Sequence, residues 1–367
     1  MNPEALGQLL QQHADWLFPV ITAALDVQLR SFAPCAEVPI FAYNFTIKKP
    51  NLQAEQAITR AFTALNLTIE GAACNSAPPQ ITVLDSGNLA DWSGCRDRLV
   101  LLRTSTGAPL KPLFDALDEC ERQTRFGGVL PRRLSTVPIV RSRTIFDRSD
   151  TVDIELPSTI DSLTNYDLDL LRIAAARTLT KANAAEAYRR WYGPMTSLAR
   201  YQLDPFEVWR DAVMRIFLEA NLPSHGMAHT AAYDGLETAQ EAQLRTEAER
   251  EETLRKALEL LGDQSRFEDE IIKKPDTAAE AIQLLDEEQT AVAFRHTPTK
   301  GPECGKHFII FSNASLFRLL KRVNMDELLF DAFKKRAVAM GLLSKKSWPV
   351  KIGDTNFSGF WIGDEKF

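Results

Sequence analysis

Three residues have the side chains needed to hold a phosphate group and its metal ion. Lys48 and Lys49 follow a predicted strand in "NFTIKKPNLQ", and Asp85 ends the apolar run "ITVLD". A loop that wraps phosphates has the pattern GxxxxGK[ST], because glycines let backbone N–H groups approach the phosphate oxygens. The turn at residues 44–50 has no glycine, and Ser86 follows Asp85 where a second acid would activate water. These residues therefore predict weak nucleotide binding at most, and no ATP hydrolysis.

The histidines and cysteines form no complete catalytic or metal-binding motif. His225 and His229 have the i,i+4 spacing that can hold a metal on a helix, but Gly226 lies between them in a loop-like context. The five cysteines are scattered and include no CxxC pair, which favours a reducing cytoplasm. No apolar run reaches the length of about 18 residues that a membrane span needs. We therefore expect a cytoplasmic protein with no catalytic residues, no metal, no cofactor and no membrane partner.

Basic residues near the C-terminus give the strongest functional signal. Residues 301–367 carry 11 basic and 7 acidic side chains, a net charge of +4, although the whole chain has a net charge of −6. Lysine and arginine side chains on one face bind DNA phosphates. The alternative is a domain used only for packing or protein contact. The candidate nucleic-acid contacts are Arg318, Lys321, Arg322, Lys334, Lys335, Arg336, Lys345, Lys346 and Lys351.

An acidic segment precedes this basic region. Residues 234–288 carry 17 acidic and 7 basic side chains, a net charge of −10. The composition predicts a long exposed helix with the ion pairs Glu251–Arg255 and Glu252–Lys256. Gly262 is the expected end of the helix and Pro275 the end of the linker. A polar helix of this kind often bridges two domains.

The N-terminal two thirds alternate strand-like and helical runs. Helices are expected at 1–33, 51–69 and 109–124, and strands at 37–47, 79–87, 97–105, 135–145 and 150–157. Two strong amphipathic helices follow, at 167–192 and 204–222. Apolar strands that alternate with helices predict a parallel α/β sheet, here followed by a helical subdomain.

The C-terminal region has a different order of elements. The strand "HFIIF" is followed by a helix capped by Ser312 or Asn313, and then by a second helix capped by Asn324 and ended by Gly341. The strands "WPVKIG" and "FSGFWIG" form a hairpin around Gly353. This order is typical of a winged helix. The expected buried face of the second helix comprises Leu328, Leu329, Ala332, Phe333, Ala337 and Met340.

The segments "GKHFIIF", "FRLLKRVNMDELLFDAFKKRAVAMGLL" and "FSGFWIG" resemble the C-terminal domain of helicase-like proteins carried by mobile genetic elements. In that family a P-loop, AAA+-type module precedes a small winged-helix tail, and "ITVLD" stands where a Walker B strand is expected. The resemblance implies a P-loop-like sheet and DNA binding by the tail. This sequence departs from the family at the phosphate loop and at the acid after Asp85.

The predicted architecture is therefore α/β: a P-loop-like domain at 1–157, a helical subdomain at 158–233, a charged helical linker at 234–275 and a winged-helix domain at 290–367. The predicted function is a DNA-binding, helicase-like accessory or regulatory protein with a degenerate nucleotide site, in replication or defence of a mobile element. The alternatives are a protein-interaction scaffold and an ATPase with a divergent phosphate loop. A protein partner or a homo-oligomer stays open.

Overall fold

The computed structural model divides into two compact units, Met1–Leu244 and Arg245–Phe367, each with its own hydrophobic core. It describes residues 1–30, 38, 41–47, 52–66, 82–85, 100–103, 114–115, 139–142, 145–197, 203–223, 227–298, 304–344, 348–352 and 354–363. The predicted helix at 109–124 lies outside these residues except for Phe114 and Asp115.

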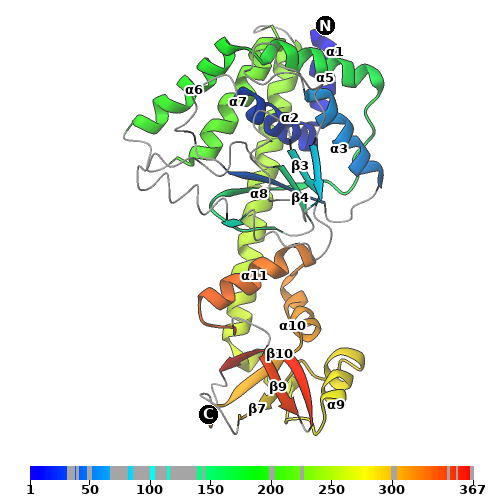
Figure 1. Cartoon of the computed structure of the whole chain (residues 1–367), viewed down its shortest axis with the longest axis vertical. Coiled ribbons are helices and arrows are strands. Elements are labelled where there is room, and N and C mark those ends of the chain that lie inside the picture. The colour runs from blue at the N-terminus through cyan, green and yellow to red at the C-terminus, as the bar shows by residue number, and fades with distance from the viewer. Residues whose placement is uncertain are drawn as a thin grey trace. The chain divides into compact units, whose positions relative to one another are not determined.

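Five parallel strands form the sheet of the first unit (Figure 1). They are β1 (Ala42–Ile47), β2 (Thr82–Asp85), β3 (Val100–Arg103), β4 (Ile139–Ser142) and β5 (Thr151–Leu156). The strand order is β2-β3-β4-β1-β5, and every neighbouring pair is parallel. All residues of β1 are buried, as expected of a strand covered on both faces. The α/β class and the parallel pairing predicted from the sequence are confirmed.

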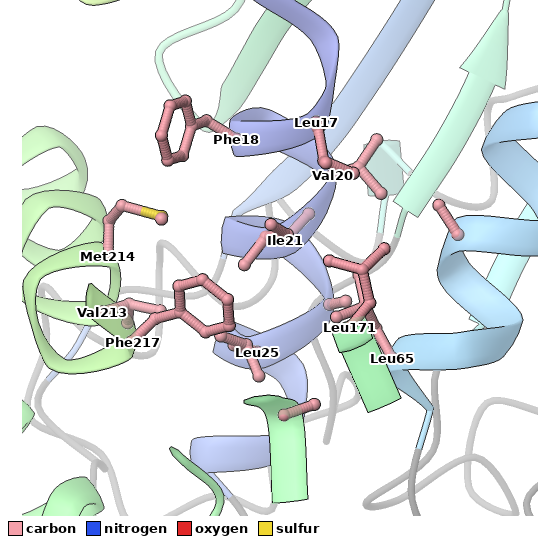
Figure 2. Packing of buried hydrophobic residues seen from close by; sticks show 14 of the residues in the cluster. Leu17, Phe18, Val20, Ile21, Leu25, Leu65, Leu171, Val213, Met214 and Phe217 are labelled. Carbon is pink, nitrogen blue, oxygen red and sulfur yellow. The ribbon is translucent and has the colours of Figure 1, made fainter. Parts of the chain in front are cut away.

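Helices pack around α2, which is buried over most of its circumference. The helices before β5 are α1 (Pro3–Gln12), α2 (Ala14–Leu29) and α3 (Leu52–Leu65). Those after it are α5 (Asn165–Thr178), α6 (Lys181–Thr196) and α7 (Pro205–Asn221). Figure 2 shows Ile21 and Leu25 of α2 with Met214 and Phe217 of α7 on one side and Leu65 of α3 on the other. The core of the first unit therefore forms around this one helix.

The predicted helix at 167–192 is two helices, so that prediction was wrong. Leu179 leaves the helical conformation after α5, and Thr180 has extended backbone angles. The Thr180 side chain then accepts a hydrogen bond from the Asn183 backbone N–H at 3.1 Å, which caps α6. Because threonine is a good helix N-cap, the break has a local cause that the apolar periodicity conceals.

Helix α8 (Met227–Gly262) is 36 residues long and ends at the predicted glycine. The boundary between the two units falls within it, after Leu244. Lys256 pairs with Glu252 at 3.2 Å, as predicted. Arg255 pairs with Glu252 and Glu259 rather than with the predicted Glu251. The helical character predicted for the acidic segment up to Gly262 is confirmed.

A five-stranded sheet of order β6-β7-β8-β10-β9 lies in the second unit. Its strands are β6 (Ile271–Ile272), β7 (Ala293–His296), β8 (Phe308–Phe311), β9 (Trp348–Ile352) and β10 (Thr355–Gly363). The β9–β10 hairpin turns between Ile352 and Thr355, as predicted. Short helical turns lie at η4 (Gln264–Arg266), η5 (Glu268–Glu270), α9 (Ala278–Ile282), η6 (Gln283–Glu287) and η7 (Lys321–Val323).

Two longer helices, α10 (Asn313–Leu320) and α11 (Glu327–Ala339), follow β8. Ser312 caps α10, in agreement with the sequence. The predicted cap of α11 was wrong: Asp326 accepts the hydrogen bond from the Leu329 N–H, and Asn324 has a left-handed φ of 63°.

The predicted buried face of α11 is confirmed except at its last residue. Met340 is 62% exposed, so its assignment to the buried face was wrong. The helix stops at Ala339, and Met340 lies at the C-cap, followed by Gly341 with a φ of 74°. The apolar stripe of α11 therefore ends one turn earlier than the sequence indicates.

Candidate nucleic-acid interface

Lys334 lies where α10, α11 and β10 meet. Its ammonium group is 2.8 Å from an Asp331 carboxylate oxygen and donates to Asn313 at 3.4 Å. It also lies 4.5 Å from the ring centroid of Phe330 and 5.7 Å from that of Phe360 on β10. A cation held over aromatic rings is attracted by their negative faces. Lys334 thus joins the helix surface to the hairpin.

The β9–β10 hairpin has one apolar face and one polar face. Val350, Ile352 and Phe357 are buried in the core of the second unit. Lys351 is opposite Asn356 in the hairpin register, and both are exposed. Because strand residues alternate between faces, the following side chains share the second face: Lys351, Asn356, Ser358 and Phe360.

These observations define one surface, called here the α11–hairpin face: Lys334, Lys335, Lys351, Asn356, Ser358 and Phe360. Lys335 is exposed on α11, next to Lys334. The pairing of Lys334 with Phe360 makes the surface continuous from helix to hairpin. Sequence reasoning missed Asn356, Ser358 and Phe360. The period-two alternation of "TNFSGFWIG" was the signal that identifies them.

Three other predicted contacts have partners within the second unit. Arg318 donates to the backbone carbonyls of Leu285, at 2.7 Å, and Ala291, at 2.5 Å. Both bonds hold α10 against the segment before β7. Arg322 pairs with Glu270 at 2.5 Å, and the Lys321 ammonium lies 5.0 Å from the Phe317 ring centroid. Arg318 therefore has a structural role, while Lys321 and Arg322 keep exposed side chains.

Arg336 lies on the flank of α11 that contacts α8. Its guanidinium donates two hydrogen bonds to the Glu251 carboxylate, each at 2.7 Å. Since successive residues of a helix are separated by about 100°, Lys334 and Arg336 lie on opposite flanks of Lys335. Lys345 and Lys346 lie outside the described residues.

The predicted nucleotide residues are not brought together by the strand order. Lys48 and Lys49 follow β1 and lie outside the described residues, and Asp85 ends β2 at the edge of the sheet. Strands β4 and β3 lie between β1 and β2. At a strand spacing of about 4.8 Å, the two strand ends are on the order of 14 Å apart. A phosphate at the turn after β1 is therefore far from the Asp85 position.

One buried carboxylate in the first unit is fully engaged in the fold. Asp26 is 0% exposed. It accepts hydrogen bonds from Arg30 Nε at 2.6 Å, Trp209 Nε1 at 2.5 Å and the Tyr43 hydroxyl at 3.1 Å. Burial and the nearby Asp26 carboxylate hold the pKa of Tyr43 well above its usual value. This network joins α2, β1 and α7, and we assign it a structural role.

Metal and membrane sites were also sought in the part of the chain that the structure describes. It contains no cluster of three or more His, Cys, Asp or Glu side chains that could hold a metal ion. His225 lies outside the described residues, and the His229 ring is 4.4 Å from that of Tyr233. Among the same described residues, no helix has the length and apolar character to span a membrane.

Comparisons with known proteins give one distant likeness. Neither a family model nor a curated protein matches the chain. A solved structure described as "SCCmec type IV Cch - active helicase" aligns with a TM-score of 0.41 and 9% sequence identity. The alignment covers 96% of this chain and 68% of that one. A TM-score of this size does not define a shared fold, so the interface rests on its own residues.

Proposed function

We propose that the chain is a DNA-binding, helicase-like accessory or regulatory protein of a mobile genetic element, with a degenerate nucleotide site. The order β8, α10, α11, β9, β10 in the second unit has the layout of a winged helix. In this proposal α11 and the hairpin contact duplex DNA. The link to mobile elements comes from the sequence resemblance of this region.

The observation that carries the proposal is the continuity of the α11–hairpin face. Lys334 contacts Phe360, and the outward face of the hairpin continues from there through Ser358 to Asn356 and Lys351. Such a surface offers ammonium groups to phosphates along a helix and a hairpin at once. The amide and hydroxyl groups between the lysines are further hydrogen-bonding groups for phosphate or sugar oxygens.

Duplex binding by the full chain tests this proposal through fluorescence anisotropy. The double variant Lys335→Glu/Lys351→Glu should bind labelled duplex at least about tenfold more weakly, because two phosphate contacts become repulsive. The matched control is Lys273→Glu/Lys274→Glu, which makes the same charge change at exposed residues before α9. The control should bind within about twofold of the parent chain.

Equal losses in the two double variants would assign the binding to net charge alone. No binding by the parent chain at low salt would favour the protein-interaction scaffold. Circular dichroism of each variant checks that the fold is kept. Both substituted lysines of the test variant have exposed side chains, so we expect little change in stability.

The degenerate nucleotide site has its own test. We expect no ATP hydrolysis above background, because the turn after β1 lacks glycine and the Asp85 position lies on the edge strand. The measurement is phosphate release with and without Mg²⁺ and duplex DNA. Turnover that disappears in Asp85→Ala would support an ATPase with a divergent phosphate loop instead.

A further inference from the structure

The acidic helix α8 supplies a partner for a basic residue next to the α11–hairpin face. Glu251 accepts two hydrogen bonds from Arg336, each at 2.7 Å. The two oxygens and two nitrogens form the bidentate arrangement that arginine also uses to bind a phosphate. A phosphate that binds Arg336 in this way must therefore replace Glu251.

The pair is accessible enough to exchange. The Glu251 side chain is 62% exposed and that of Arg336 is 30% exposed. An ion pair open to water contributes little free energy, so competing anions can displace it. A buried pair would resist such exchange, because breaking it leaves an unpaired charge out of water.

A second pair has the same arrangement in the same unit. Arg322 pairs with Glu270 at 2.5 Å, with side chains that are 43% and 38% exposed. In both pairs the arginine comes from the basic region 301–367 and the glutamate from the acidic region 234–288. The charge asymmetry of the sequence is thus expressed as contacts between its two halves.

We propose that Glu251 is an autoinhibitory residue that competes with DNA phosphates for Arg336. The inference rests on the proposed function, since it assigns a regulation to the same surface. With Glu251 in place, Arg336 is neutralised and duplex affinity is lowered. When duplex binds, Arg336 exchanges the carboxylate for a phosphate, and Glu251 is released to solvent.

The test compares two neighbouring substitutions in the full chain by anisotropy with labelled duplex. Glu251→Gln should bind about threefold more tightly, the range expected for loss of one exposed ion pair. Glu252→Gln is the matched control, because it makes the same charge change one residue away. Hydrogen bonds from Arg255 and Lys256 lower the pKa of Glu252 to about 2, so the control removes a real charge. It should bind within about 1.5-fold of the parent chain.

Two further variants separate local release from general charge. In an Arg336→Ala background, Glu251→Gln should change the affinity no more than Glu252→Gln does, because the competing pair no longer exists. Glu251→Asp keeps the charge and shortens the side chain, and it should give a smaller gain than Glu251→Gln. This variant also tests the inference if the glutamine variant fails to fold.

The outcomes distinguish the two proposals. If the parent chain binds duplex and Glu251→Gln binds equally well, autoinhibition is overturned and DNA binding stands. Equal gains in Glu251→Gln and Glu252→Gln overturn it as well, because net charge then explains both. If neither the parent chain nor Glu251→Gln binds duplex at low salt, the proposed function fails and the inference fails with it.

Discussion

The two units of this chain use charged side chains in opposite ways. In the first unit Asp26 is 0% exposed and accepts hydrogen bonds from three side chains of α2, β1 and α7. In the second unit Arg336 and Glu251 form a pair that is open to solvent. A buried carboxylate with several donors fixes the packing around it. An exposed pair costs little to exchange, so only the second kind is suited to binding an anionic partner.

The largest expected effect concerns the buried side of this comparison. Asp26→Ala should destabilise the first unit by roughly 3–5 kcal/mol, because it leaves Arg30 buried without its carboxylate. The control Asp211→Asn removes an exposed i,i+4 partner of Arg215 and should cost no more than about 0.5 kcal/mol. Urea denaturation followed by circular dichroism measures both. Equal costs would mean that the Asp26 network is not what holds these three elements together.

A smaller effect is expected in the sheet of the second unit. A Cβ atom added at Gly359 would lie 2.6 Å from the Phe311 carbonyl oxygen on β8. We expect Gly359→Ala to cost about 1–3 kcal/mol, because β8 and β10 must move apart. Gly363→Ala is the control on the same strand, since a Cβ there meets nothing within 4 Å. Thermal unfolding compares the two, and a neutral Gly359→Ala would contradict the close approach of these strands.

A pH dependence is the smallest expected effect. Burial, and to a lesser extent Lys274, lowers the pKa of His296 below 6.5. The unfolded chain therefore binds a proton more readily than the folded one as the pH falls through 6.5. The stability of the second unit should be fully present above this pH and decrease below it. The free energy of unfolding at pH 7.5 and 5.5 measures the decrease. His296→Gln should reduce it, and an unchanged decrease would assign it to other groups.

Local features of the fold were predictable because their causes are local. Ser312 was identified as a cap candidate and Gly341 as a helix end from residue type alone, and the hairpin around Gly353 followed from alternation. Where two candidates of similar chemistry stood close together, the choice was harder. The cap of α11 is Asp326 rather than Asn324, which takes the left-handed conformation that ends the preceding turn instead.

The candidate site was less predictable, because it depends on contacts between distant segments. Nothing in the sequence near Arg336 indicates that Glu251 is its partner, or that Arg318 is bound to the carbonyls of Leu285 and Ala291. The strand order is also a long-range property. The sequence places Asp85 at the end of a strand, but only the sheet order shows that this strand lies at the edge.

The salt dependence of duplex binding by the full chain tests the central claim most directly. If Lys334, Lys335 and Lys351 each contact a phosphate, log K should fall linearly with log salt concentration, with a slope of about −3. The measurement is anisotropy of a labelled duplex at several salt concentrations. Affinity that does not change with salt, or no binding at about 20 mM salt, where electrostatic attraction is least screened, would contradict a phosphate-binding α11–hairpin face.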